Sequence, residues 1–436
     1  MGLTLIEKIL LKASDKRGLS DFVYAKVDFC FGNDITAPLA VKEFLNAQFD
    51  SVFNPKKIGF ICDHFLPARD FKAANNIKLL REFARRFKIK HFYDIDKCGI
   101  EHIFLIERGL IKPGNLVIGA DSHTCTAGAI GAAGFGVGST DLAVAMKEGC
   151  VWLRVPKTIK FVYKGKAGKY LSGKDLILHT IGKIGVDGAL YKVMEFAGPV
   201  IRAMNLDERL SMTNMAVEAG AKTGLIEPDA VTIEYLKKVH GPGSMVHTGG
   251  RKTSAADYRL WTKLKSDADA HYEEIIEIDV TKLSPQVACP HLPSNVKPVE
   301  ELRDVSLTQV VIGSCTNGRL SDLRAAAKII KGKKIKSGLR VIIIPATPTV
   351  YAAAEREGLL TAFHEAGCIV SPPTCGPCLG GHMGILDKGE VALATTNRNF
   401  IGRMGHPESF VYLSSPVVAA ASAITGKITH PAKIKV

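Results

Sequence analysis

The 436-residue sequence has no long hydrophobic run and few aromatic side chains. No stretch approaches the roughly 20 apolar residues that a membrane-spanning helix needs. The N-terminal residues 1–8 predict an amphipathic helix start and lack the apolar core of a signal peptide. Aromatic residues make up 7% of the chain and do not alternate with its basic runs, which disfavours a surface for single-stranded nucleic acid. Internal repeats, coiled-coil heptads and low-complexity tracts are also absent.

Basic residues outnumber acidic ones, 57 to 43, which gives a net charge of +14. We expect most of this excess on a solvated lysine-rich surface, as in 331–336; an anionic substrate, an acidic partner subunit and nucleic acid are the functional alternatives. Ten cysteines without a secretory signal predict reduced thiols and metal ligation rather than disulfides, and therefore a cytoplasmic protein. The length predicts about three domains.

Alternating strand and helix patterns predict an α/β fold with three α/β domains, at residues 1–155, 156–280 and 281–436. The predicted strands are 58–61, 115–119, 158–163, 308–312 and 339–344, and the predicted helices are 76–87, 174–183 and 321–327. The polar, glycine-rich stretch 240–254 predicts an exposed loop.

Two predicted strands of the first domain are followed by histidine-containing motifs, Asp63-His64 and Asp121-Ser122-His123. In open α/β sheets, ligands bind beyond the carboxyl ends of the strands, so both motifs are well placed for a site. The glycine-rich run 128–138 does not fit a dinucleotide fingerprint and predicts close backbone packing near a ligand or cluster.

Three cysteines lie in two further motifs. Cys315, in Gly-Ser-Cys-Thr-Asn, follows a predicted strand and precedes a predicted helix, whereas Cys375 and Cys378 lie on a proline- and glycine-containing loop. Three thiolates brought together can hold three irons of a [4Fe–4S] cluster and leave the fourth iron open for chemistry. A Cys-x-x-Cys motif is also typical of zinc and redox sites, so a structural zinc site or three buried thiols are the alternatives.

Eight motifs, in the same order along essentially the whole chain, resemble the aconitase family. Within it they are most similar to the large subunits of 3-isopropylmalate dehydratase and homoaconitase. The motifs are Asn33-Asp34-Ile35-Thr36-Ala37-Pro38, Asp63-His64, Gly99-Ile100-Glu101-His102, Asp121-Ser122-His123-Thr124, Asn214 with Glu218, Gly313-Ser314-Cys315-Thr316-Asn317, Cys375-Gly376-Pro377-Cys378 and Asn397-Arg398-Asn399-Phe400-Ile401-Gly402-Arg403.

The resemblance implies three α/β domains of the aconitase iron–sulfur type around a central [4Fe–4S] cluster bound by Cys315, Cys375 and Cys378. It implies a hydro-lyase that isomerises a hydroxy di- or tricarboxylate by dehydration and rehydration. The expected reaction converts 2-isopropylmalate to 3-isopropylmalate in leucine biosynthesis, and homoaconitate and dimethylmalate chemistry are close alternatives. A different class, an RNA-binding regulator in the cluster-free state, is supported only by the positive charge.

The resemblance also implies roles for site residues. Asp63 and His64 resemble the pair that protonates the leaving hydroxyl, and His102 and Glu218 match a second pair that orders iron-bound water. The turn with Asp121 and His123 lines the same site. The residues expected around substrate and cluster are Asn33, Ser122, Asn214, Asn397, Arg398 and Arg403.

The family's mobile fourth domain has no counterpart in this sequence. In the family that domain supplies the serine base and the arginines that select the substrate. The resemblance therefore implies a separate small subunit that supplies both. A second departure is Thr126, where single-chain aconitases carry an asparagine.

Overall fold

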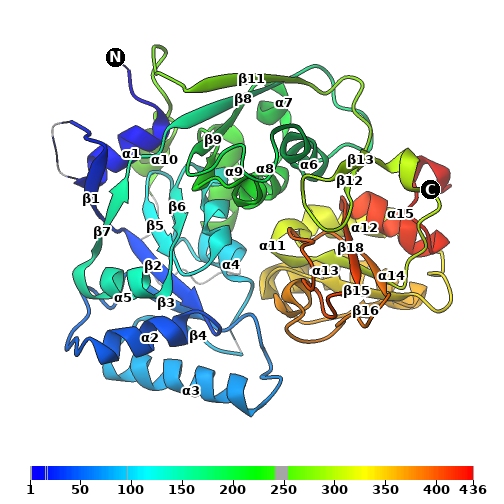
Figure 1. The fold of residues 1–436 in the computed structure, drawn as a ribbon, viewed down its shortest axis with the longest axis horizontal. Helices are drawn as coiled ribbons and strands as arrows, with labels where there is room; N and C mark the ends of the chain where they lie inside the picture. Colours follow the sequence, from blue (N-terminus) through cyan, green and yellow to red (C-terminus); the bar gives the residue numbers. More distant parts are fainter. Residues whose placement is uncertain (1, 15, 17, 96, 241–253, 436) are drawn as a thin grey trace. The chain divides into compact units, whose positions relative to one another are not determined.

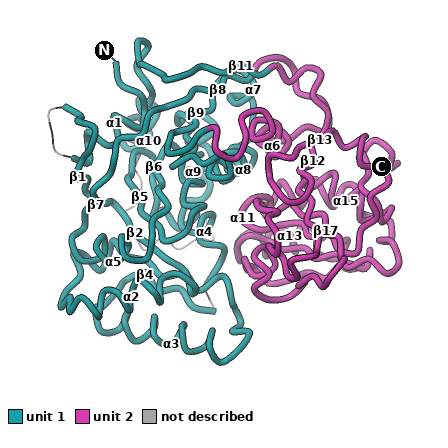
Figure 2. Tube along the Cα trace, in the orientation of Figure 1, with its two compact units in different colours: residues 1–163, 189–278 teal, residues 164–188, 279–436 magenta. Residues whose placement is uncertain are grey.

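The computed structural model describes residues 2–14, 16, 18–95, 97–240 and 254–435, so all but the ends of the loop predicted at 240–254 lie outside the described residues. The chain separates into two compact units, shown in Figure 2: unit 1 contains residues 1–163 and 189–278, and unit 2 contains 164–188 and 279–436. The predicted bounds of three domains, at 155 and 280, stay a prediction. The α/β character is confirmed by the sheets and helices described below.

The first sheet of unit 1 is parallel throughout, in the order β4-β3-β2-β5-β6 (Figure 1). Its strands are β2 (Phe29–Asn33), β3 (Ile58–Ile61), β4 (His91–Tyr93), β5 (Leu116–Gly119) and β6 (Ala133–Gly136). The strands predicted at 58–61 and 115–119 are confirmed as β3 and β5. β2, β3 and β5 are buried along their whole length, as expected for parallel strands that are covered on both faces.

Helices and a small antiparallel ribbon surround this sheet. They are α1 (Leu5–Ser14), α2 (Ala37–Asn46), α3 (Phe71–Arg86), α4 (Glu101–Glu107), α5 (Ser139–Glu148) and the paired strands β1 (Phe22–Lys26) and β7 (Cys150–Arg154). The helix predicted at 76–87 is α3, which begins five residues earlier. The reason is a cap: the Asp70 carboxylate accepts a hydrogen bond from the backbone N–H of Ala73.

The second sheet of unit 1 has the order β10-β9-β8-β11. Its strands are β8 (Thr158–Lys164), β9 (Val193–Ala197), β10 (Thr223–Leu225) and β11 (Glu274–Asp279), and the neighbouring helices are α7 (Pro199–Ala203), α8 (Leu206–Asn214), α9 (Ala230–His240) and α10 (Ala255–Trp261). The strand predicted at 158–163 is confirmed as β8. The glycine-rich run packs closely against this part of the unit, since a Cβ atom on Gly128 would lie 1.6 Å from the Gly224 carbonyl oxygen.

Unit 2 is built on one sheet of seven strands, in the order β13-β12-β18-β17-β14-β15-β16. Its strands are β12 (Gln286–Ala288), β13 (Val296–Pro298), β14 (Gln309–Gly313), β15 (Arg340–Ile344), β16 (Ile369–Val370), β17 (Val391–Ala394) and β18 (Phe410–Leu413). The five strands from β18 to β16 are parallel, and β12 is antiparallel to β18 and β13. The strands predicted at 308–312 and 339–344 are confirmed as β14 and β15.

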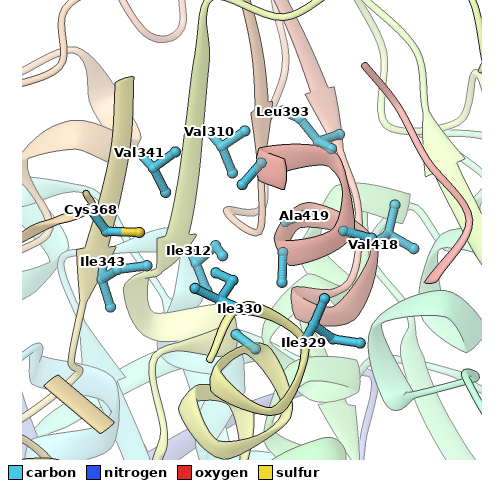
Figure 3. Packing of buried hydrophobic residues seen from close by; sticks show 14 of the residues in the cluster. Val310, Ile312, Ile329, Ile330, Val341, Ile343, Cys368, Leu393, Val418 and Ala419 are labelled. Carbon is cyan, nitrogen blue, oxygen red and sulfur yellow. The ribbon is translucent and has the colours of Figure 1, made fainter. Parts of the chain in front are cut away.

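The helices of unit 2 are α6 (Gly173–Ile184), α11 (Ser314–Asn317), α12 (Leu320–Ile330), α13 (Pro348–Arg356), α14 (Leu359–Ala366) and α15 (Pro416–Thr425). The helices predicted at 174–183 and 321–327 are confirmed as α6 and α12. Figure 3 shows the core of the unit, in which apolar side chains of β14 and β15 meet α12 and α15. Among the described residues, no helix has both the length and the apolar character that crossing a membrane requires.

Candidate active site and metal centre

Three neighbouring parallel strands of unit 1 end in polar side chains. β2 ends at Asn33 and is followed by Asp34, Asp63 comes two residues after β3, and Asp121 comes two residues after β5. Because these strands lie side by side and run in the same direction, their carboxyl ends meet at one edge of the sheet. The sequence-based placement of the Asp63 and Asp121 motifs at strand ends is confirmed.

His64 lies between two buried carboxylates. Its Nδ1 atom is 2.6 Å from Asp63 Oδ1 and 4.0 Å from Asp34 Oδ1, and Asp34 also accepts hydrogen bonds from the backbone N–H groups of His64 and Phe65. Burial by itself lowers the pKa of His64, but the charge and hydrogen bond of Asp63, with the charge of Asp34, outweigh it and raise the pKa to about 10. The imidazole is therefore held as a cation at neutral pH.

Glu101 connects this pair to the end of β2. The Glu101 backbone N–H donates to Asp63 Oδ2 over 2.8 Å, and the Asn33 side-chain amide donates to Glu101 Oε1 over 2.9 Å. Burial, together with the charges of Asp63 and Asp121, raises the pKa of Glu101 well above its usual range. Asn33 also accepts hydrogen bonds from the N–H groups of Ile35 and Thr36, so the structure places it as a support for Glu101. Its expected contact with substrate stays a prediction.

A second cluster gathers around Asp121, and its pairing differs from the sequence-based expectation. His102 Nε2 lies 3.1 Å from Asp121 Oδ1, whereas Glu218 Oε1 lies 2.9 Å from His123 Nε2. The expected pair of His102 with Glu218 is therefore wrong, because α4 directs His102 toward the turn after β5. Burial raises the pKa of Asp121, but the two histidines outweigh it and hold that pKa well below its usual range.

Asn214 and Glu218 do not lie in one α-helix, although their spacing of four residues is typical of one helix face. α8 ends at Asn214, and a 3-10 turn, η2 (Met215–Ala219), follows it. After this change from α-helix to 3-10 turn, both side chains contact the turn after β5. Asn214 donates to Thr126 Oγ1 over 2.8 Å, and Glu218 contacts His123. Thr126 is the position at which this sequence departs from the family pattern. In the structure its hydroxyl accepts a hydrogen bond from an asparagine of another segment. Ser122 begins the same turn, η1 (Ser122–Ile130).

The three cysteines expected to bind the cluster all lie in unit 2. Cys315 is in the first turn of α11, directly after β14. Cys375 directly precedes a 3-10 turn, η4 (Gly376–Leu379), which contains Cys378. The backbone before Cys315 is unusual: Gly313 has φ +141°, and a Cβ atom there would lie 2.2 Å from the Ile344 carbonyl oxygen. Only glycine fits at such a position.

The loop after β17 contacts two of these sulfurs. Asn397 Nδ2 donates to Cys315 Sγ over 3.4 Å, and Asn397 Oδ1 lies 3.4 Å from Cys378 Sγ. Arg403 Nη2 donates to Cys378 Sγ over 3.5 Å. The structure therefore brings Cys315, Cys378, Asn397 and Arg403 together, and Arg398 belongs to the same loop.

The contacts at the sulfurs bear on which metal group these cysteines could hold. Four sulfurs around one zinc ion lie about 3.8 Å apart, given Zn–S bonds of about 2.3 Å. Within the described ranges, the groups of three ligand atoms lying within 4.8 Å of one another are His102, Asp121 and His123, and Asp34, Asp63 and His64; the three cysteines form no such group. Hydrogen bonds from Asn397 and Arg403 to the sulfurs of Cys315 and Cys378 are of the kind that ligand sulfurs of an iron–sulfur cluster accept.

Several buried polar residues that support these clusters were not identified from the sequence as site residues. Asp34 and Glu101 stand beside predicted site residues in their motifs, so their position was a usable signal. Lys174 and Arg319 gave no such signal, because a cation in or beside a predicted helix usually faces water. Both side chains are fully or almost fully buried in unit 2.

Comparison with known proteins finds relatives that match over the whole chain. The chain is 55% identical to 3-isopropylmalate dehydratase large subunit 1 of Pyrococcus furiosus, over 99% of each chain. It is 55% identical to the 3-isopropylmalate dehydratase large subunit of Thermodesulfovibrio yellowstonii and 53% identical to that of Moorella thermoacetica, over the full length of each.

A solved structure shares the fold. Aconitase X of Thermococcus kodakaraensis in its holo-form matches with a TM-score of 0.50 and 13% identity, over 92% of this chain and 94% of that one. The family model described as Aconitase family (aconitate hydratase) matches residues 7–305 and 297–426. This chain therefore belongs to the aconitase family.

Proposed function

We propose that this chain is the cluster-bearing large subunit of a hydro-lyase that isomerises 2-isopropylmalate to 3-isopropylmalate, in leucine biosynthesis. The reaction type is supported above all by His64, a buried imidazolium held by Asp63 and Asp34 at the carboxyl edge of a parallel sheet. The choice of substrate is supported by relatives with more than half of their residues identical over their full length. Homoaconitate and dimethylmalate chemistry are the alternatives within the class.

Membership of the aconitase family implies an iron–sulfur cluster. We propose a [4Fe–4S] cluster held by Cys315, Cys375 and Cys378, whose open iron supplies a Lewis acid for the leaving hydroxyl and a substrate carboxylate. Asn397 and Arg403 hold the sulfurs by hydrogen bonds. Arg398 is assigned to a substrate carboxylate, for which a planar guanidinium offers two parallel donors.

Acid catalysis is assigned to His64. In the dehydration step, its proton goes to the leaving hydroxyl, which departs as water, while a base removes the proton from the neighbouring carbon. Rehydration reverses these transfers with the hydroxyl on the other carbon. The carboxylates of Asp63 and Asp34 keep the imidazole protonated and oriented before each transfer.

The second cluster is assigned to positioning. Asp121 accepts hydrogen bonds from His102 and from the backbone N–H of His123, and Glu218 fixes the opposite side of the His123 ring. We propose that this chain of contacts orders water at the reacting centre, with Ser122 beside it. The serine base and the arginines that select the substrate are assigned to a separate small subunit, a partner that the words "large subunit" in the relatives' names support.

The test is anaerobic reconstitution with iron and sulfide, followed by mixing with the candidate small subunit and assay of 2-isopropylmalate, homocitrate and dimethylmalate. We expect a brown protein that turns over 2-isopropylmalate only in the mixture. Turnover of another substrate would contradict the proposed substrate and retain the reaction class. A colourless chain that binds RNA with a steep salt dependence would contradict the enzyme and favour the regulatory alternative.

The ligand assignment has its own test. Cys375→Ser should abolish retention of the cluster and turnover together, because it removes one of three thiolates. Cys150→Ser, which changes a cysteine outside the proposed ligands, is the matched control and should retain both. Iron content and absorbance near 400 nm measure retention. A brown, fully active Cys375→Ser chain would contradict the assignment.

A further inference from the structure

Lys174 is a fully buried lysine in the first turn of α6, within unit 2. Its Nζ atom donates to the carbonyl oxygen of Thr395 over 2.9 Å and also to that of Thr396. These two residues directly follow β17. An ammonium group buried without a carboxylate partner is costly for a folded protein, so such a residue calls for a functional reason.

The carboxylate nearest to Lys174 in the sequence, that of Asp175, forms its hydrogen bonds with other residues. Asp175 accepts hydrogen bonds from the backbone N–H and hydroxyl of Ser172 and from the backbone N–H of Gln286. In the described part of the chain no ion pair joins Lys174 to an acid. Among the residues that the structure describes, the hydrogen bonds of Lys174 Nζ go to backbone carbonyls, which carry no net charge.

The peptide that Lys174 binds is connected to the proposed cluster ligands in two ways. The Thr395 hydroxyl accepts a hydrogen bond from the Gly313 N–H over 2.8 Å and donates one to the Gly313 carbonyl over 3.1 Å, two residues before Cys315. Asn397, two residues after Thr395, contacts the sulfurs of both Cys315 and Cys378. Lys174 thus fixes the segment that joins the ends of β14 and β17.

The charges around Lys174 also connect it to the proposed cluster ligands. Burial lowers the pKa of Lys174 to about 7, and negative charge on the sulfurs of Cys315 and Cys378, and then on Asp175 and Asp322, opposes that shift. Three thiolates around a [4Fe–4S] core with a charge of 2+ leave a net negative charge in a buried site. In the protein alone, the sulfurs of Cys315 and Cys378 already act on the ammonium more strongly than the carboxylates of Asp175 and Asp322 do.

We propose that Lys174 is a positioning residue for the iron–sulfur cluster: its ammonium group compensates the charge of the buried cluster and holds the Thr395–Asn397 segment against the ligand sulfurs. This inference rests on the proposed cluster site and extends it to a residue outside the family motifs. It assigns a role to α6, whose residues lie far from the cysteines in the sequence.

The test uses two neutral variants. Lys174→Gln retains a hydrogen-bond donor without charge, and Lys174→Met retains neither; Lys183→Gln, on the exposed side of the same helix, is the matched control. The first readout is the melting temperature of each apoprotein. We expect Lys174→Gln to melt at or above the wild-type temperature, because it removes a buried charge that is hydrogen-bonded to carbonyls and to no carboxylate.

The second readouts are the reduction midpoint of the reconstituted cluster and its bleaching by an iron chelator. Both Lys174 variants should shift the midpoint to lower potential, since a positive charge favours the reduced cluster. They should also hold iron roughly 10- to 100-fold less tightly, the usual cost of losing an outer-shell partner of a metal site. Lys174→Met should bleach faster than Lys174→Gln, and Lys183→Gln should match the wild type in every readout.

Two results would overturn the inference while the cluster proposal stands. One is a folded Lys174→Gln chain with the wild-type midpoint and bleaching rate. The other is an apoprotein that Lys174→Gln destabilises or fails to fold, since the lysine would then serve the fold without any cluster. A wild-type chain that takes up no cluster would overturn the proposed function itself, and this inference with it.

Discussion

At the scale of single residues, the main feature is His64, which two buried carboxylates keep protonated. His64 and Asp63 are sequence neighbours after β3, but Asp34 comes from the end of β2. Because two buried carboxylates face one imidazole, the proton on His64 is stable well above the pH at which a free histidine loses it. Such a group is suited to donating a proton to a poor leaving group such as hydroxide.

Removing the imidazole should separate catalysis from cluster binding. His64→Ala should lower kcat in the reconstituted mixture by roughly 10²- to 10⁴-fold, the usual contribution of a general acid. The cysteines lie in unit 2, so the iron content and the visible absorbance should stay at wild-type values. His271→Ala, at an exposed position of unit 1, is the control. Near-native turnover by His64→Ala would remove this residue from the mechanism.

Asp34 gives a prediction about pH. The raised pKa of His64 means that its ion pairs stabilise the fold in full below pH 6.5 and that this contribution is lost as the pH rises through about 10. Asp34→Asn removes one of the charges that raise the pKa, so the imidazole should lose its proton at lower pH.

Histidine NMR titration of the apoprotein measures this shift, and the alkaline limb of the pH–rate profile should move down with it. Asp50→Asn, which changes a fully exposed aspartate of the same unit, should leave the titration unchanged. If Asp34→Asn and the wild type titrate together, Asp63 alone sets the proton affinity.

At the scale of helices and strands, hydrophobic runs predicted five strands within one residue of their observed bounds, but most elements of the structure were not predicted individually. β3 and β5 were found because they are short apolar runs that end in polar turns. The start of α3 was missed because its first turn, before residue 76, lacks a clear apolar pattern and begins at the Asp70 cap. Strand-end motifs likewise predicted where Asp63 and Asp121 lie.

Side-chain pairing was less predictable than the elements. The pairing of His102 with Asp121 and of His123 with Glu218 depends on how α4, η1 and η2 pack, which residue spacing does not encode. The same limit applies to Lys174: a lysine at the start of a helix predicts solvent exposure, and only the packing of α6 near the end of β17 reveals that it is buried.

The turn after β14 gives a prediction at this scale. Gly313 combines φ +141° with a carbonyl oxygen 2.2 Å from where a Cβ atom would lie. Gly313→Ala should therefore lower the free energy of unfolding by at least about 2 kcal/mol, a typical cost of forced backbone strain. Chemical denaturation of the apoprotein measures this.

The same substitution should also displace Cys315 and reduce cluster uptake, which iron content after reconstitution measures. Gly168→Ala is the control in the same unit, because its new Cβ atom would have no neighbour closer than 3.9 Å. Equal stability and equal iron uptake in both variants would show that the turn tolerates a side chain.

At the scale of the whole molecule, the chain divides its chemistry between two compact units. The histidine and carboxylate clusters belong to unit 1, and all three proposed cluster ligands belong to unit 2 (Figure 2). The segments that carry or contact the ligand sulfurs come from the ends of β14 and β17 and from η4, which the chain reaches in three separate passes. A bound cluster would therefore cross-link segments that the sheet alone brings together.

Cluster uptake should stabilise unit 2 directly, because a group that binds only the folded state lowers the population of every opened form of its site. Hydrogen exchange followed by mass spectrometry should show the largest gain in protection at the ends of β14 and β17, in α11, and around η4. The β1–β7 ribbon of unit 1 should exchange at the same rate with and without the cluster, and it serves as the internal reference. Protection that rises uniformly over both units would mean that the cluster acts on global unfolding. Protection that leaves the end of β14, α11 and η4 unchanged would contradict the proposed ligands, because Cys315 follows β14 and Cys375 and Cys378 lie at η4.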